Sequence, residues 1–235
     1  MVTEGRTSKK QDAAMLTFTR SQALAESLKQ LTALEALHID VSIPFKSLNH
    51  LCDMGSVDAI FIEINDPSTV DESLELVKQI RLVSRAAIIF MLFTHPKSFS
   101  VVNCYLAGAD HCVKLSGSQV EKNDLLSTIL HGSAWKTTIQ LTLDRIRLHL
   151  YAEGKKIDIS YTEMTLLDAL IKAPQHVMSQ ASIAKALGPD LVFYDPRALE
   201  KTISRLRTKI RSAYNIDLIQ GVRGFGYRLR RGVVF

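Results

Sequence analysis

Several features that define particular classes of protein are scarce in this sequence. Glycine (11 residues) and proline (6 residues) are too few among 235 residues for a low-complexity or collagen-like chain. The longest apolar run, Ala86–Phe93, is far shorter than the roughly 20 residues that a membrane-spanning helix needs. The N-terminus lacks the apolar core of a secretory signal. We therefore expect a cytoplasmic protein that does not contact a membrane.

Groups that carry catalysis or bind metals are also few. The three cysteines are irregularly spaced, which excludes a recognisable disulfide framework or zinc pattern. The sequence has no Gly-rich phosphate loop and no clear pairing of a nucleophile with a base, so we expect neither an enzyme nor a cofactor. Cys104 and Cys112, eight residues apart, leave open a thiol-responsive sensor or interaction protein, although two buried thiols explain them more simply.

The charge is divided unevenly along the chain. Residues 1–135 contain 12 Lys and Arg against 15 Asp and Glu, whereas residues 136–235 contain 17 against 9. The segment Arg197–Arg231 alone has ten basic residues and only two acidic ones. Such a concentration favours binding to a polyanion, although a solvated helical face would also account for it.

The first half alternates apolar runs with amphipathic stretches. Alternating strands and helices predict a doubly wound α/β domain with a five-stranded parallel sheet, in which helices cover both faces. The predicted strands are Met15–Thr19, Ile39–Ile43, Val57–Ile64, Ala87–Phe93 and Cys112–Leu115. The predicted helices include Ser21–Leu34, Glu72–Leu82, Ser100–Leu106 and Asn123–Leu130.

The second half begins with a small antiparallel sheet and continues with three helices. Ser160 and Glu163 have the spacing of a capping box, Ser179 can cap a second short helix, and Pro196 suits the first position of a third. Two short strands around Val222–Gly226 then predict a hairpin. These elements predict an α+β domain.

The third helix of this half is strongly amphipathic. Leu199, Ile203, Leu206 and Ile210 recur at helical spacing and predict one buried face. Basic and hydroxyl side chains occupy the remaining surface, where they can contact bases and phosphates in a major groove.

Residues 139–231 resemble the winged helix-turn-helix domain of OmpR/PhoB-type regulators. The resemblance lies in the motifs Ile203–Ile210 and Val222–Arg228, at their spacing in this chain. It implies that the third helix enters the major groove of promoter DNA, that Arg223 enters the adjacent minor groove, and that the loop 187–195 contacts RNA polymerase. The predicted DNA contacts are Arg197, Lys201, Ser204, Arg205, Arg207, Thr208 and Arg223.

Residues 15–130 resemble the receiver domain of response regulators, through Val57–Glu63 and Ala107–Asp110. In that family an acidic pair holds a divalent cation, an aspartate accepts a phosphoryl group, and a lysine pairs with it. Here Thr19 and Arg20 replace the acidic pair, Glu63 stands at the acceptor position, and Lys114 lies one residue too early in its strand. We therefore expect a degenerate receiver that has lost Mg binding and phosphorylation.

Two interpretations of the altered pocket remain open. Glu63 paired with Arg20 or Lys114 can imitate a phosphorylated aspartate, while Thr94 keeps the hydroxyl found on the fourth strand of the family. Alternatively, Glu63 is an unused carboxylate in a domain that only dimerises. A conventional regulator phosphorylated at a displaced aspartate, Asp58 or Asp66, is a further alternative.

Together these features predict a sequence-specific transcriptional regulator of the atypical response-regulator kind. It would bind double-stranded DNA as a homodimer formed through the receiver-like domain. The expected parts are a disordered segment 1–14, a receiver-like domain 15–131, a linker 132–138 and a winged helix-turn-helix domain 139–235.

Overall fold

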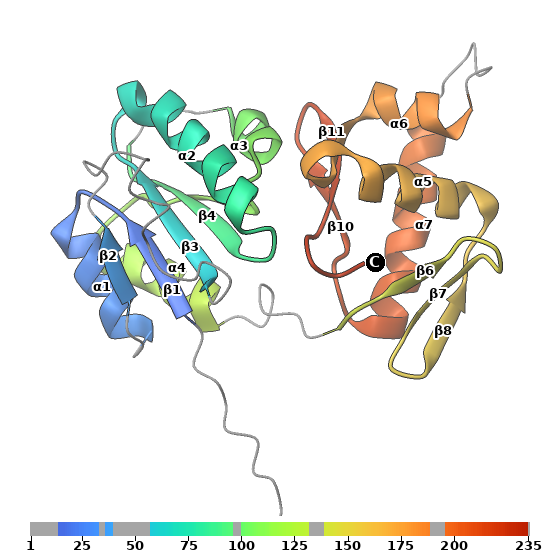
Figure 1. The fold of residues 1–235 in the computed structure, drawn as a ribbon, viewed down its shortest axis with the longest axis horizontal. Coiled ribbons are helices and arrows are strands. Elements are labelled where there is room, and N and C mark those ends of the chain that lie inside the picture. Colours follow the sequence, from blue (N-terminus) through green and yellow to red (C-terminus); the bar gives the residue numbers. More distant parts are fainter. Residues whose placement is uncertain are drawn as a thin grey trace, which may run out of the picture.

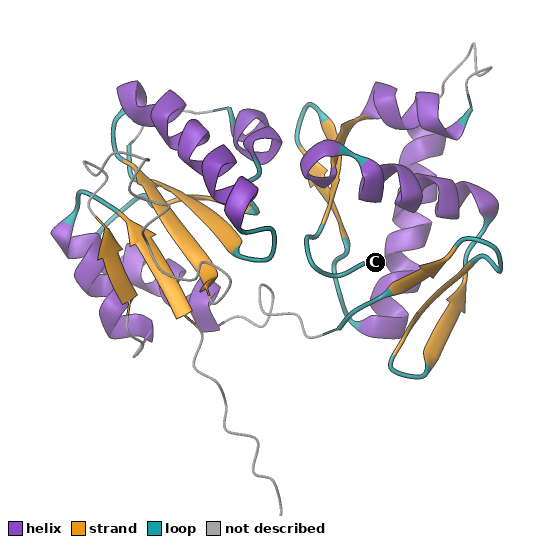
Figure 2. Ribbon diagram, in the orientation of Figure 1, coloured by secondary structure: helices purple, strands orange, loops and turns teal. Residues whose placement is uncertain are grey.

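The computed structural model describes residues 14–32, 36–39, 57–95, 100–131, 139–188 and 196–234. Residues 14–131 contain one sheet, and residues 139–234 contain two smaller ones (Figures 1 and 2). We call these parts the N-terminal and C-terminal domains. The predicted linker 132–138 lies outside the described residues, as does the predicted disordered segment except Ala14, which begins the first strand. None of the described helices is both long enough and apolar enough to cross a membrane.

The N-terminal domain is a doubly wound α/β domain, which confirms the predicted class. Its parallel strands are β1 (Ala14–Phe18), β2 (Ala36–Ile39), β3 (Val57–Ile64), β4 (Ile88–Phe93) and β5 (His111–Lys114). The strands lie in the order β2-β1-β3-β4-β5. The helices are α1 (Gln22–Thr32), α2 (Val70–Val83), α3 (Val101–Ala107) and α4 (Gln119–His131), and a 3-10 turn, η3 (Pro67–Thr69), precedes α2.

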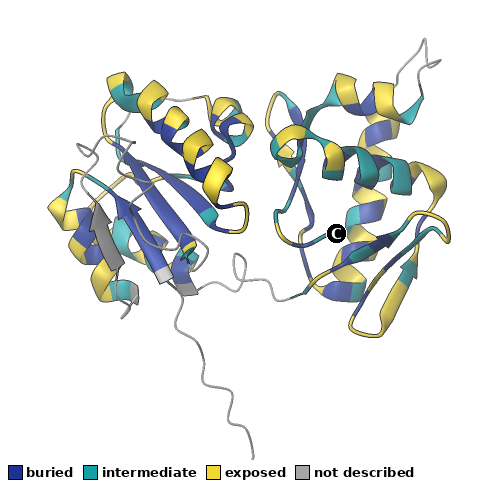
Figure 3. Ribbon diagram, in the orientation of Figure 1, coloured by how far each residue is buried: buried dark blue, intermediate teal, exposed yellow. Residues whose placement is uncertain are grey.

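Alternation along the strands divides the core of this domain into two layers. Ile60, Ile62 and Ile64 of β3 pack with α2 and α3, whereas Phe61, between them, packs with α1 and α4. Figure 3 shows the resulting buried sheet between helices whose outer faces are exposed. Because both faces are covered, the ends of the strands are the places where this domain can present functional groups.

The predicted bounds of this domain differ most from the structure at the second strand and at the last helix. The second strand lies at Ala36–Ile39 instead of Ile39–Ile43, and residues 40–43 lie outside the described part of the chain. The last helix begins at Gln119, earlier than the predicted Asn123. Ser118 explains the early start, because its amide donates to the Glu121 carboxylate at 2.7 Å while its hydroxyl accepts from the Glu121 amide at 3.4 Å.

The C-terminal domain is the predicted α+β winged helix-turn-helix. Its elements are β6 (Thr142–Asp144), β7 (His149–Ala152), β8 (Lys155–Asp158), α5 (Tyr161–Lys172), η4 (Pro174–His176), β9 (Val177–Ser179), α6 (Gln180–Leu187), α7 (Pro196–Tyr214), β10 (Ile219–Val222) and β11 (Gly226–Leu229). Both predicted caps are present, since Ser160 and Glu163 form a capping box and the Ser179 hydroxyl accepts from the Ser182 amide at 3.0 Å. One core cluster joins the helices to both sheets.

The two domains meet where α3 ends and β5 begins. The Asp110 carboxylate accepts hydrogen bonds from Arg81 of its own domain and from Nε of Arg231 of the C-terminal domain, the latter at 3.1 Å. The Arg228 guanidinium lies 4.2 Å from the centroid of the Tyr105 ring. Figure 1 shows α3 on the side of the N-terminal domain that faces β11. No pattern in the sequence predicts this contact.

The wing formed by β10 and β11 is held by a close backbone approach at Gly226. A methyl group there would lie 2.2 Å from the Met178 carbonyl oxygen and 2.8 Å from the Gln180 amide nitrogen. These atoms belong to the backbone of β9 and of the start of α6, so they cannot move aside cheaply. Glycine at this position therefore lets β11 pair with β9.

We expect Gly226→Ala to lower the free energy of unfolding by about 1–3 kcal/mol, because the added methyl forces β11 away from β9. Urea denaturation of the two proteins measures this difference. Gly221→Ala is the matched control, since its methyl would meet only the end of the Arg207 side chain, at 3.9 Å. Equal losses in the two variants would contradict the steric explanation.

A second prediction concerns His111 at the start of β5. Its ring stacks on Phe90 with 4.6 Å between centroids, and burial, reinforced by Arg228, lowers its pKa to about 4. Since an unfolded histidine has a pKa of about 6.5, the unfolded state takes up the proton first as the pH falls. The stabilisation is complete above pH 6.5 and is lost towards pH 4.

We expect the free energy of unfolding to fall by an amount on the order of 3 kcal/mol through this titration alone. Denaturation series between pH 7 and pH 4 on wild type and on His111→Phe isolate the effect, because phenylalanine keeps a ring on Phe90 without titrating. Parallel pH profiles for the two proteins would show that His111 is not buried in its neutral form.

Candidate nucleic-acid interface

Helix α7 presents one polar face to solvent because its apolar face is fixed in the core. Leu199, Ile203, Leu206 and Ile210 are each 3% exposed or less, as their spacing predicted. Pro196 is the first residue of the helix, where its missing N–H costs no hydrogen bond. The burial of these four side chains determines which residues face outward.

The structure brings most of the predicted DNA contacts to this outer surface. Arg197, Lys201, Ser204, Arg205 and Thr208 are exposed on α7. The Thr208 hydroxyl donates to the Ser204 carbonyl at 3.0 Å, which orients that side chain along the helix. Arginine and lysine on such a face can reach guanine acceptors or phosphates, and serine and threonine can contact either.

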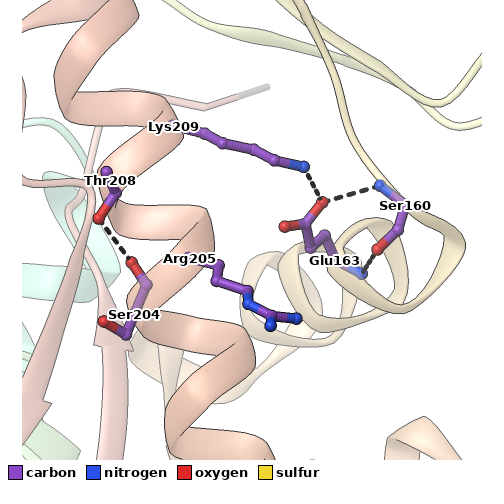
Figure 4. A pocket seen from close by; sticks show the side chains of 6 residues that line it. All are labelled: Ser160, Glu163, Ser204, Arg205, Thr208 and Lys209. Carbon is purple, nitrogen blue, oxygen red and sulfur yellow. Dashed lines mark hydrogen bonds and ion pairs between the residues drawn. The ribbon is translucent and has the colours of Figure 1, made fainter.

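A hollow of about 500 Å³ lies between this face and the start of α5 (Figure 4). Arg205 extends across it from α7, and Ser160 and Glu163 form its opposite wall. Lys209 is already engaged there, because its Nζ lies 2.8 Å from the buried Glu163 carboxylate. This ion pair holds the capped start of α5 beside α7, so the hollow has a defined shape.

Arg207 differs from the other predicted contacts. Its Nε donates to the Ile219 carbonyl at 2.8 Å, and its guanidinium lies 5.5 Å from the centroid of the Tyr227 ring. It is only partly exposed. The structure therefore gives Arg207 a role that sequence reasoning missed, the attachment of α7 to the wing, since helix periodicity alone does not reveal a partner that lies beyond the helix.

The wing presents Arg223 at its tip. The turn is closed by a hydrogen bond from the Phe225 amide to the Val222 carbonyl at 3.0 Å, and Gly224 adopts the left-handed conformation that the turn requires. Arg223 is exposed. By contrast, Arg228 and Arg231 face the N-terminal domain, so the basic tail is divided between two surfaces.

The altered pocket of the N-terminal domain lies at the carboxyl ends of β1, β3 and β4. Glu63 is buried there and accepts hydrogen bonds from the Thr19 hydroxyl and, at 2.9 Å, from the Thr94 hydroxyl. Arg20 and Lys114, the expected partners of Glu63, are exposed, and neither bonds to it among the described residues. The carboxylate is thus held by two neutral hydroxyls and not by a cation.

These residues do not fit a receiver's divalent cation. The structure puts a threonine and an exposed arginine where the family has carboxylates, and the remaining carboxylate already accepts two hydrogen bonds. Asp66 serves as the cap of η3 through the Ser68 amide at 2.8 Å, a hydrogen bond that lowers its pKa. Asp58, the other alternative acceptor, is exposed on β3.

The two described cysteines lie together against the core of this domain. Cys104 is buried, Cys112 is partly buried, and neither forms a disulfide. Contact with Cys104 and burial raise the pKa of the Cys112 thiol. A thiol that resists ionisation is a poor nucleophile, which argues against a reactive sensor at Cys112.

Comparison with known proteins agrees with this architecture. Residues 154–229 match the family model described as "Transcriptional regulatory protein, C terminal". The chain is 24% identical over 217 residues to the response regulator MprA of Mycobacterium sp. (strain KMS), covering 89% of this chain and 94% of MprA. It is 27% identical over 108 residues to the phosphate regulon transcriptional regulatory protein PhoB of Rhizobium meliloti (strain 1021), covering 46% of this chain and 45% of PhoB.

Among solved structures, the chain is similar to the response regulator DrrB of Thermotoga maritima, described as an OmpR/PhoB homolog. The alignment covers 92% of this chain and 98% of the DrrB chain. The identity is 14% and the TM-score 0.41. The family match includes the whole of α7 and of the wing, and the MprA match covers 89% of the chain. The C-terminal domain therefore matches a family of transcriptional regulators, and the chain as a whole is similar to response regulators such as MprA.

Proposed function

We propose that this response regulator binds promoter DNA in a sequence-specific manner as a homodimer, and that it does so without phosphorylation of its N-terminal domain. The observation that carries the DNA-binding part is the exposed polar face of α7 beside the exposed tip of the wing. The two surfaces suit a major groove and the adjacent minor groove. The protein then acts by binding and not as an enzyme, and we place it in the cytoplasm.

Phosphorylation independence rests on the state of Glu63. Its carboxyl group is already bonded to Thr19 and Thr94, and no acidic pair stands beside it to hold a cation. A phosphoryl group would therefore lack both an acceptor aspartate and charge neutralisation. We propose that the pocket binds no Mg and that the two threonines hold the domain in one state.

Dimerisation through the N-terminal domain is supported by apolar side chains that its helices leave exposed. Leu106 of α3 is 45% exposed and Val120 of α4 is 68% exposed. A symmetric contact would place two winged helix-turn-helix domains on DNA half-sites about one helical turn apart. The proposed contact with RNA polymerase falls on the loop 187–195, of which residues 189–195 lie outside the described part of the chain.

Removal of either predicted base contact tests the interface. We expect Arg205→Ala and Arg223→Ala each to weaken promoter binding about 5- to 100-fold, and Arg205→Ala also to relax base preference, because its guanidinium is placed to contact base edges. Fluorescence anisotropy with promoter and scrambled duplexes at physiological salt gives both quantities. Lys156→Ala removes an exposed cation of β8 and is the control. Full affinity in both arginine variants would show that DNA binds elsewhere.

Incubation with radiolabelled acetyl phosphate and Mg tests phosphorylation independence. We expect no label on the wild-type protein, while a conventional response regulator treated in parallel becomes labelled. Label on wild type that disappears in Asp66→Ala or Asp58→Ala would establish a displaced acceptor instead. Glu63→Asp is also expected to stay unlabelled, because restoring the aspartate does not restore the acidic pair.

A further inference from the structure

The contact between the domains gathers more positive than negative charge. Arg81, Arg228 and Arg231 meet there, and the carboxylate that answers them is Asp110, whose side chain is 8% exposed. Burial lowers the pKa of the nearby Arg230, which Asp217 and Asp110 oppose, and its Nη2 is buried without a hydrogen-bond partner among the described residues. Asp217 is already paired with Arg211, so the cationic groups at this contact outnumber the carboxylates that act on them.

The pKa values of these groups reflect both burial and mutual repulsion. Burial, with a smaller contribution from the charge of Arg231, lowers the pKa of Arg81 to about 10, although Asp110 opposes the shift. Burial also lowers the pKa of Arg228, and Arg231 adds a small contribution. An anion placed beside these buried guanidinium groups would favour their charged form.

A cavity of about 450 Å³ opens beside this contact, with walls from both domains. Among its described lining residues Glu75 is the one acid, and it already bonds to Lys78 and Gln79. The cationic and polar side chains that line the cavity are Lys78, Gln79, Arg81 and Arg85 from the N-terminal domain, and Gln175, His176 and Arg231 from the C-terminal domain.

Arginines of both walls keep donors available to a ligand. Arg231 uses Nε for Asp110 and Nη2 for Gln175, which leaves Nη1. Arg85 is exposed just beyond the end of α2. His176 offers no donor, because its Nδ1–H donates to the Ile171 carbonyl at 3.0 Å and burial lowers its pKa, which favours the neutral ring with an unprotonated Nε2. Arg81 contributes charge alone, since its three nitrogens already bond to the protein.

The wall supplied by the C-terminal domain is built in an unfavourable backbone conformation. Gln175 and His176 both adopt left-handed φ angles, 53° and 59°, which cost about 1–3 kcal/mol each in residues with side chains. Gln175 also needs the absence of a side chain at Gly108, where a methyl would lie 2.9 Å from its Oε1. The two domains are thus shaped to each other along this wall.

We propose that this cavity binds a small phosphorylated anion that bridges α2 and η4. Its donors approach from opposite walls, which suits the tetrahedral oxygens of a phosphate group better than a planar carboxylate facing one guanidinium. The volume lies within the range of small-molecule sites and exceeds the space a single phosphate needs. Such a ligand goes beyond DNA binding and would favour the contact between the domains.

Calorimetry with the full chain tests the site, with inorganic phosphate, pyrophosphate and adenosine monophosphate as probes. At constant ionic strength we expect saturable binding of pyrophosphate or the nucleotide with Kd below about 1 mM, weaker binding of phosphate, and none of succinate. If the nucleotide binds more tightly than pyrophosphate, the ligand class is a phosphoester. If pyrophosphate binds more tightly, the ligand class is a free inorganic anion. The double variant Lys78→Gln/Arg85→Gln should weaken binding at least 10-fold.

Lys155→Gln/Lys156→Gln is the matched control, because it removes the same charge from exposed residues elsewhere. Failure of all three phosphate probes to saturate would overturn the proposal. So would equal affinity in the two double variants, or binding that is lost in Arg205→Ala, since the anion would then occupy the DNA face. Binding of the probe is read without DNA, so a failure of the site and a failure of the proposed DNA interface are distinguishable.

Discussion

A single buried carboxylate joins three parts of this molecule. Asp110 accepts from the Ile89 amide at the start of β4, from Arg81 of α2 and from Arg231 beyond β11. Removing a buried charge's partner is expensive, because the remaining charge is left without water or a counter-ion. The edge of the sheet, the position of α2 and the attachment of the C-terminal domain therefore depend on one another through this residue.

Asp110 and Glu63 lie at opposite ends of the strands of the N-terminal domain. Glu63 and its threonines lie at the carboxyl ends of the strands, the edge where this class of fold places ligands. Asp110 lies at the amino ends, before β5. The edge opposite to the Glu63 pocket is therefore the one that contacts the C-terminal domain.

The sequence was most informative where local rules act alone. The mostly apolar run Val57–Ile64 was predicted with its observed bounds, and Ser160 and Glu163 located the start of α5, because capping depends on residues three apart. The stripe from Leu199 to Ile210 predicted both the burial of α7 and its exposed residues, since a helix has only one way to bury four side chains at that spacing. Much of the candidate interface follows from that stripe.

Contacts between distant parts were not predictable. β9 has only three residues and depends on pairing with β11, so no periodicity marks it. The resemblance of the third helix predicted that Arg207 contacts DNA. Its Nε donates to the carbonyl of Ile219, which lies 12 residues further along the chain and outside the helix. Glu63 likewise accepts hydrogen bonds from Thr19 and Thr94 and not from Arg20 or Lys114. The strand register, and not charge alone, determines which side chains reach it.

The bond from Arg207 to Ile219 bears on the proposed DNA complex. It fastens α7 to β10, a strand of the wing that carries Arg223. In that complex, the distance between the side chains in the major groove and Arg223 in the minor groove would be set by the protein. Duplexes whose grooves already have matching widths need no deformation, whereas others must bend or narrow at an energetic cost. Operator choice in this regulator would therefore include the shape of base pairs that no side chain touches.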